Sequence, residues 1–350
     1  MRVIKIIFLM LIFAGFAHAS QSKISRVNHD YIMNEFGIEN NLSSQKVVAD
    51  IYRSIDSSDK KLFKDIITSQ AHNAFLVKTE IESIEAPEFL LYLAMVESHL
   101  KNTVTSHAKA GGMWQLMPTT AKNFGLRIDT HVDERRDPAA STDAAFSYIL
   151  HLRQNFGKWY TALMAYNCGE GCMNRAIKAA GNDDLGTLLS SNAVPKETKN
   201  FIKRIIKFAY IAQSDSMQKV LRFENEPWAL KRIAVAPGTK LSAIAKQIGI
   251  SQTQMNSYNA HITNGVSPSN GKYFFYIPES KYTEFVLSRG DFQAYEPNLI
   301  KNRPKLSFAK FRPQHEHIVK VEQIEKTTPT FASKTDEKIR TVAMAFDLKF

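Results

Sequence analysis

The sequence FLLYLAMVE at residues 89–97 predicts a helix that is apolar on nearly every side. A helix of this kind has to be buried, so we expect it at the centre of a helical domain. Pro87 and Glu88 stand where the first turn begins, and both residue types are favoured there. Glu97 ends the run against apolar surface, where a carboxyl group resists ionisation and its pKa rises. A carboxyl group that stays protonated near neutral pH can act as a general acid.

Two polar segments with glycines follow this helix, GGMWQLMP at residues 111–118 and AYNCGEG at residues 165–171. Segments of this kind form loops, and binding and catalytic residues are often found on loops that a rigid scaffold positions. One predicted acid with two such loops indicates a cleft that cleaves a sugar chain.

Helical periodicity predicts an all-helical domain over residues 44–212. Helix-like patterns cover residues 44–53, 59–67 and 74–84 before the apolar run. Further along, Asp137 and Pro138 mark a helix start, as a capping residue followed by proline in the first turn. The last helix is expected from about residue 196 to residue 212.

From residue 231 the pattern changes to strand, helix, helix and strand, at residues 233–235, 241–247, 252–258 and 273–278. This predicts a separate small module. The fold class is therefore mainly α, with an all-helical domain followed by a small α+β domain of βααβ order.

The first residues have the features of a secretory signal peptide. Met1-Arg2 and Lys5 precede an apolar core from Ile6 to Phe16, and Ala17-His18-Ala19 predicts cleavage after Ala19. The core is too short to span a bilayer comfortably, and no cysteine follows it at the position of a bacterial lipid anchor. We therefore expect an exported, soluble protein of the periplasm.

The formal net charge is +11, and the excess lies in the C-terminal part. Residues 72–215 carry 16 Lys and Arg against 15 Asp and Glu, whereas residues 216–350 carry 20 against 12. A basic region can bind nucleic acid, anionic lipid or an anionic polymer. Export argues against nucleic acid and favours a wall polymer whose peptides carry carboxylates. We expect a monomer, associated with the cell envelope at most peripherally.

Cys168 and Cys172 are the two cysteines of the chain, and both lie in or next to the AYNCGEG segment. In an oxidising compartment they either form a disulfide across about one helical turn or remain two partly buried thiols. Because no pair of histidines lies near them at ligand spacing, we expect no metal site, and we expect no cofactor.

These motifs resemble those of the soluble lytic transglycosylase family over about residues 73–212. The resemblance rests on Glu97-Ser98, residues 106–118, DERRDP at 133–138, Ser141-Thr142 and residues 165–171. It departs at His107 and Lys109, where the family often has Pro and Gly. The small module resembles a LysM domain, which binds glycans containing N-acetylglucosamine, at residues 237–239, 241–245 and 276–278.

The resemblance implies a lysozyme-like fold and divides the chain into five segments. They are a signal peptide (1–19), an N-terminal helical extension (20–72), a lysozyme-like lytic transglycosylase domain (73–215), a LysM-like glycan-binding module (230–280) and a basic, largely disordered tail (281–350).

The resemblance also implies roles for single residues. Glu97 corresponds to the family's one catalytic acid and base. The implied substrate-binding residues are Ser106, near the N-acetyl group, Gln115 and Met117, which line the cleft, Tyr166, which positions the acid, and its neighbour Asn167. Each also has a simpler interpretation. Glu97 can be a helix-end carboxylate with an arginine or amide partner, Ser106 a turn cap, Asn167 a helix end, and Gln115, Met117 and Tyr166 packing residues.

The family's reaction cleaves the β-1,4 bond between N-acetylmuramic acid (MurNAc) and N-acetylglucosamine (GlcNAc) in peptidoglycan strands. It forms 1,6-anhydro-MurNAc and consumes no water. Most glycosidases need two carboxylates, whereas in this sequence only Glu97 lies where it would stay protonated. Two other functions remain open, a lysozyme-like muramidase that adds water and a non-catalytic scaffold that binds the wall.

Overall fold

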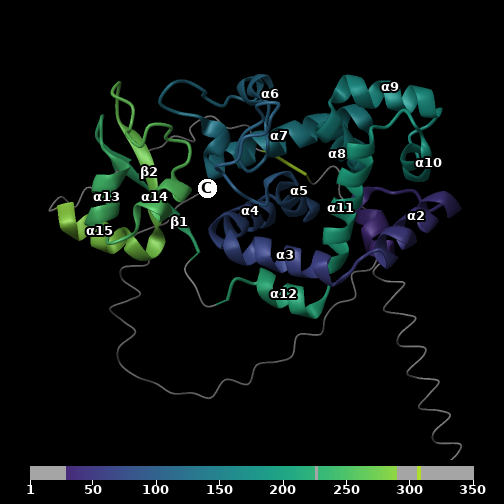
Figure 1. The fold of residues 1–350 in the computed structure, drawn as a ribbon, viewed down its shortest axis with the longest axis horizontal. Helices are drawn as coiled ribbons and strands as arrows, with labels where there is room; N and C mark the ends of the chain where they lie inside the picture. The colour runs from purple at the N-terminus through teal and green to yellow at the C-terminus, as the bar shows by residue number, and fades with distance from the viewer. Residues whose placement is uncertain (1–28, 225–227, 290–305, 309–350) are drawn as a thin grey trace, which may run out of the picture. The chain divides into compact units, whose positions relative to one another are not determined.

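The computed structural model describes residues 29–224, 228–289 and 306–308 (Figure 1). The predicted signal peptide at residues 1–19 lies outside the described residues, and so does most of the predicted tail at residues 281–350. Among the residues that are described, no helix combines the length and the apolar character needed to cross a membrane.

The region predicted to be all-helical consists of helices joined by loops, as expected. The helices extend beyond the predicted limits of residues 44–212, because a helix is described over residues 29–36 and α12 follows residue 212. The elements that follow are α2 (Leu42–Arg53), α3 (Ser57–Ser69), α4 (Ala71–Ser83), α5 (Phe89–Ser98), α6 (Pro118–Asn123), η1 (Glu134–Arg136), α7 (Pro138–Phe156), α8 (Trp159–Cys168), α9 (Glu170–Ala180), α10 (Leu185–Ser190), α11 (Lys196–Ala212) and α12 (Asp215–Leu221).

Helix α5 is the buried centre of this region. Every residue of α5 is buried except Glu97, which is partly buried. The helix packs against α4 and α11, and the rings of Phe36 and Trp159 lie 5.0 and 5.3 Å from that of Phe89. The prediction of a central buried helix is confirmed, because a surface that is apolar on all sides is stable only when other helices cover it.

Helix α7 begins where the capping signal places it. The Asp137 carboxylate accepts hydrogen bonds from the backbone N–H groups of Ala139 and Ala140, at 2.9 and 2.8 Å. Pro138 occupies the first helical position, where a missing N–H costs nothing. The predicted start of this helix is therefore confirmed.

The small module has the predicted βααβ order. Its elements are β1 (Leu230–Val235), α13 (Leu241–Gln247), α14 (Gln252–Tyr258) and β2 (Tyr273–Pro278). The strands pair antiparallel, from Leu230 opposite Pro278 to Val235 opposite Tyr273. All of β2 is buried, so this strand forms the floor of a second hydrophobic core.

Two pieces of the predicted tail region carry structure. After η2 (Glu279–Lys281), residues Tyr282–Arg289 form α15, where Phe285 packs into the second core. Further on, Phe308 is only 1% exposed and stacks on Trp159 at 5.9 Å. Buried aromatic side chains thus fix two sites within a region whose composition predicts disorder.

Candidate active site

Glu97 lies in the last turn of α5, at a cleft of about 410 Å³. The cleft lies between the ends of α5 and α8 and one face of α11. Its lining consists of Val96, Glu97, Asn167, Lys196, Glu197, Asn200, Phe201 and Arg204. The predicted acid therefore lies at the end of the buried helix and lines a cleft that is large enough for part of a ligand.

The pKa of Glu97 is raised to about 8. Burial is the main cause, because it disfavours the charged carboxylate. The negative charge of Glu197 raises the pKa further, while the positive charge of Arg204 opposes the shift. Glu97 is therefore mostly protonated at neutral pH, as a general acid must be.

The chain leaves α5 through two residues in the left-handed backbone region, His99 at φ 55° and Leu100 at φ 61°. This region is uncommon for residues other than glycine. The turn is held by Ser98, whose hydroxyl donates to the Met113 carbonyl at 2.7 Å and accepts from the Lys101 N–H at 3.1 Å. The hydrogen bond to Met113 also ties the end of α5 to the GGMWQLMP loop.

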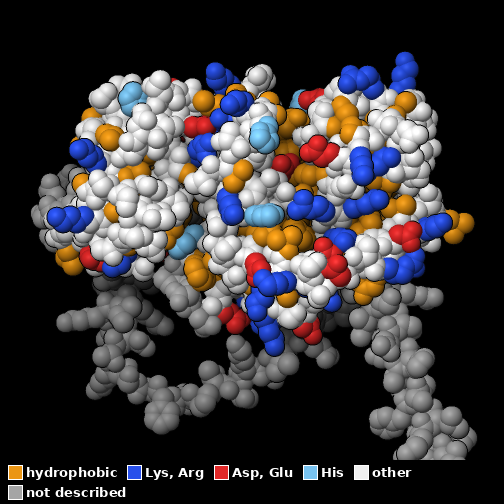
Figure 2. Space-filling view, viewed as in Figure 1, with side chains coloured by type: hydrophobic (Ala, Val, Ile, Leu, Met, Phe, Trp, Pro, Cys, Tyr) orange, Lys and Arg blue, Asp and Glu red, His pale blue; other side chains and the backbone are white. Residues whose placement is uncertain are grey.

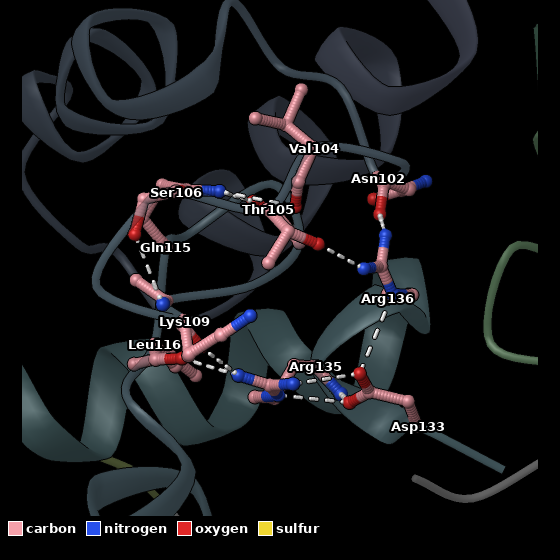
Figure 3. Close-up of polar contacts among 12 residues, drawn as sticks. Asn102, Val104, Thr105, Ser106, Lys109, Gln115, Leu116, Asp133, Arg135 and Arg136 are labelled. Carbon is pink, nitrogen blue, oxygen red and sulfur yellow. Dashed lines mark hydrogen bonds and ion pairs between the residues drawn. The ribbon is translucent and has the colours of Figure 1, made fainter.

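Arg135 holds that loop in shape (Figure 3). Its buried guanidinium donates to both carboxylate oxygens of Asp133, at 2.9 and 2.8 Å, and to the carbonyls of Lys109 and Leu116, at 2.7 and 3.2 Å. A Cβ on Gly112 would lie 1.7 Å from the Arg135 carbonyl oxygen, so only glycine fits. The DERRDP and GGMWQLMP motifs thus form one structural unit.

Arg136 extends this unit to the start of the loop. Its guanidinium donates to the Asn102 carbonyl at 3.2 Å and to the Thr105 hydroxyl (Figure 3). Lys109 adopts φ 68°, a conformation that glycine reaches without strain. The departure from the family pattern at residue 109 therefore falls at a position whose backbone suits glycine.

The structure brings only one predicted substrate-binding residue, Asn167, into the cleft with Glu97. Ser106 and Gln115 lie in the neighbouring loop. The Ser106 hydroxyl accepts from the Ala110 N–H at 3.0 Å, and the Gln115 amide donates to the Gly112 carbonyl at 2.7 Å. Met117 belongs to the GGMWQLMP loop and is 44% exposed, so it is not a buried packing residue.

Tyr166 is close enough to Glu97 for the two charges to influence each other, and its pKa is raised well above the ordinary value, chiefly by burial. Its hydroxyl donates to the Trp114 carbonyl at 2.7 Å. In this structure the tyrosine therefore ties α8 to the GGMWQLMP loop.

The sequence reasoning missed the α11 wall of the cleft. Lys196, Glu197, Asn200 and Arg204 lie about 100 residues after Glu97, outside the motifs quoted from the sequence. The available signal was the polar face of a strongly amphipathic helix, and a polar face usually meets solvent. Thr198 links this wall to α8, because its hydroxyl donates to the Asn167 side-chain oxygen at 2.7 Å.

Cys168 and Cys172 are two free, partly buried thiols in this structure. The pKa of Cys168 is raised to about 12, first by burial and then by a hydrogen bond with Cys172. Of the two alternatives left open by the sequence, the structure contains the pair of thiols.

The chain matches two family models. Residues 75–187 match the transglycosylase SLT domain, and residues 229–293 match the LysM-like domain of the lytic transglycosylase MltD. The chain carries an SLT domain and an MltD-type LysM-like domain. The sequence-based identification of both is confirmed, and so is the mainly helical fold class with a small α+β module. The match to the SLT domain ends before α11, the second wall of the cleft.

Relatives of this SLT-domain chain include membrane-bound lytic murein transglycosylase D of Escherichia coli strain K12. It is 27% identical over 253 residues, which are 71% of this chain and 56% of the relative. The chain thus spans about half the length of this relative. Peptidoglycan transglycosylase gp16 of Escherichia phage T7 is 30% identical over 125 residues, 35% of this chain and 9% of that protein. The soluble lytic transglycosylase SLT70 of E. coli aligns in structure with a TM-score of 0.36 and 21% identity, over 49% of this chain and 32% of its own.

Proposed function

We propose that this protein is a peptidoglycan lytic transglycosylase that cleaves the MurNAc–GlcNAc β-1,4 bond and forms 1,6-anhydro-MurNAc, for remodelling of the cell wall. The observation that carries the proposal is Glu97, an acid with a pKa raised to about 8 at an open cleft. The SLT domain match gives this geometry its substrate class.

In the proposed reaction, Glu97 donates its proton to the glycosidic oxygen while the bond from that oxygen to C1 of MurNAc breaks. The 2-acetamido oxygen of the same sugar stabilises the positive charge that develops at C1. The Glu97 carboxylate then accepts the proton of the C6 hydroxyl, whose oxygen bonds to C1 and closes the anhydro ring. Glu97 ends the cycle protonated, so one residue serves as acid and as base.

The other site residues have proposed roles around this acid. Asn167 contacts the sugar in the cleft, a role supported by its place in the lining and by its hydrogen bond to Thr198. Tyr166 supports Glu97 by fixing the neighbouring loop. Ser106, Gln115 and Met117 are assigned to the part of the glycan strand that passes over the loop held by Arg135.

The surroundings of the enzyme are part of the proposal. We infer that the protein is exported to the periplasm and acts there as a monomer on wall glycan, with peripheral contact to the envelope. The MltD-type module, residues 229–293, supports a second glycan contact outside the cleft. The proposed division of the chain into domains is that of the five segments given above.

One observation favours a second candidate, a muramidase that adds water. Glu197 also lines the cleft, so a second carboxylate is present where the sequence predicted one alone. Hydrolytic glycosidases use such a group to activate water or to attack the sugar. The candidates differ in whether water enters the product.

Mass spectrometry of wall digested by the purified protein separates the two reactions. We expect muropeptides ending in 1,6-anhydro-MurNAc, each lighter by one water than the hydrolysed product, with no label incorporated from ¹⁸O-water. Reducing-end MurNAc that carries the label would replace the lyase by the muramidase. Intact wall after prolonged incubation, with the protein bound to it, would support the non-catalytic scaffold instead.

A further inference from the structure

The α11 wall of the cleft carries positively charged groups that the proposed chemistry does not use. Lys196, Asn200 and Arg204 are spaced by four residues, so they share one helix face, and all three are exposed and line the cleft. With a rise of 1.5 Å per residue, Lys196 and Arg204 stand about 12 Å apart along the axis. A neutral sugar ring does not require two cations along this distance.

A further cation stands close to Arg204. Both Arg204 and Lys101 lower the pKa of His99, after the larger effect of burial, so both cations lie near this histidine. Arg204 also acts on Glu97. Figure 2 shows Lys and Arg side chains in a row across the middle of the face that holds α5 and α11. We call Lys101, Lys196 and Arg204 the cationic rim.

Among the described residues, no carboxylate forms an ion pair with a member of the cationic rim. In the described part of the chain, the ion pairs involve other cations, such as Lys207 of α11, which pairs with Asp59 at 2.7 Å. The one carboxylate on the same wall is Glu197, and it offsets only part of the charge. Cations grouped beside a cleft and left unpaired attract an anionic ligand.

We propose that the cationic rim binds a carboxylate of the peptide stem that branches from MurNAc. This rests on the proposed function, in which MurNAc occupies the cleft and its stem leaves close to Glu97. A carboxylate suits the guanidinium of Arg204, which can donate two parallel hydrogen bonds to it. The substrate class is therefore a glycan strand with its stems attached, and a strand without stems loses this contact.

The test compares two substrates, wall glycan with intact stems and the same glycan after enzymatic removal of the stems. The variants are Arg204→Gln, Lys101→Gln and the double variant, in the full chain. Each single change should lower kcat/KM on stem-bearing glycan about tenfold more than on stripped glycan, the scale of one hydrogen bond to a charged group. The matched control, Lys178→Gln, alters an exposed lysine of α9 away from the cleft and should change neither value.

The comparison of substrates removes the effect of Arg204 on the acid. Loss of that cation raises the pKa of Glu97 further, and this affects both substrates alike. Equal losses on both would assign Arg204 to the acid and overturn the stem subsite. The stem subsite would also be overturned if the rim variants lost no kcat/KM, or if Lys178→Gln lost as much as they did.

A binding measurement separates this proposal from the proposed function. In the Glu97→Gln background, calorimetry compares a GlcNAc–MurNAc disaccharide that carries a stem peptide with the free disaccharide. Tighter binding of the stem-bearing ligand, lost with Arg204→Gln and weakened by salt, supports the subsite even if no turnover is found. Equal affinity for both ligands contradicts it. Competition by inorganic phosphate without a preference for stems would replace the carboxylate by a phosphate-bearing polymer.

Discussion

A carboxyl group with a raised pKa lies at each end of α5, and of the two only Glu97 lines a described cavity. At the C-terminal end, Glu97 has a pKa of about 8 and lines a hollow of about 410 Å³. At the N-terminal end, Glu35 has a pKa raised to about 7 by burial and by the charge of Glu88. Its carboxylate accepts a hydrogen bond from the Glu88 N–H at 3.0 Å.

The difference lies in what each carboxyl group can reach. The Glu35 carboxylate accepts a hydrogen bond from the Glu88 N–H at the start of α5. This N–H group has no partner within the helix, so Glu35 caps the helix. In the described residues, no hydrogen bond from the protein fixes the Glu97 carboxyl group, which is left to face a ligand. A raised pKa therefore identifies an acid only where there is also room for a substrate.

The largest expected effect comes from removing the acid at one end and then at the other. Glu97→Gln should lower kcat on wall glycan by about 10²–10⁴-fold, because proton transfer from a placed acid contributes this much. Glu35→Gln should keep wild-type kcat, since it is remote from the cleft lining. Product release from purified wall measures both, with circular dichroism to confirm folding. If the two variants lost activity equally, the contrast between the ends of α5 would be wrong.

The next effect tests whether space matters as much as the pKa. Asn200→Trp places a large ring in the cleft from an exposed position of α11. We expect kcat/KM to fall by about 100-fold, the scale of a misplaced substrate, while Glu97 still titrates above its ordinary range. The matched control is Asn182→Trp, at an exposed position outside the cleft lining. Full activity of Asn200→Trp would move the substrate to another surface.

Much of the helical frame follows from local patterns. The apolar run predicted α5, and Asp137-Pro138 predicted the start of α7. The helix expected from about residue 196 to 212 is α11, although it is not the last one, because α12 follows it. These features are visible locally because capping, proline placement and periodicity act over a few residues. Glu97 could be predicted for the same reason, as the polar end of an apolar helix.

The remainder of the site depends on contacts between distant segments. Glu197 and Arg204 reach the cleft only because α11 packs along α5, and no local pattern distinguishes them from other charges on an amphipathic helix. The hydrogen bond of the Tyr166 hydroxyl to Trp114 spans 52 residues. Pairings of this kind are set by the tertiary fold, which the periodicity of single segments does not specify.

A smaller effect tests how charge tunes the acid. Glu197→Gln removes an anion that raises the pKa of Glu97, so that pKa should fall. Because the acid works while protonated, activity declines as pH rises through about 8 in the wild type, and this limb should move to lower pH. The loss at pH 8 should stay below about tenfold, which corresponds to one pKa unit. The pH profile of kcat/KM measures the limb, and Arg204→Gln should move it the opposite way. A shift to higher pH in Glu197→Gln would contradict the assigned charge effect.

The smallest expected effect is on stability, at the N-terminal end of α5 where Glu35 lies. The pKa of Glu35 is raised in the folded protein to about 7 from the ordinary value of 4.5, so the folded state holds its proton more tightly than the unfolded state. The stabilisation is complete below the unfolded pKa and is lost as pH rises through about 7.

The melting temperature of the wild type should therefore fall between pH 5 and pH 8. In Glu35→Gln, which cannot ionise, the fall should be smaller by a few degrees, because each 1 kcal/mol shifts the melting temperature of a domain of about 200 residues by about 2–4 °C. Differential scanning calorimetry at the two pH values measures the fall, with Glu170→Gln as a control at an exposed surface carboxylate. Identical falls in all three proteins would mean that Glu35 is already ionised at pH 5, and the two ends of α5 would then differ in pKa as well as in access to a substrate.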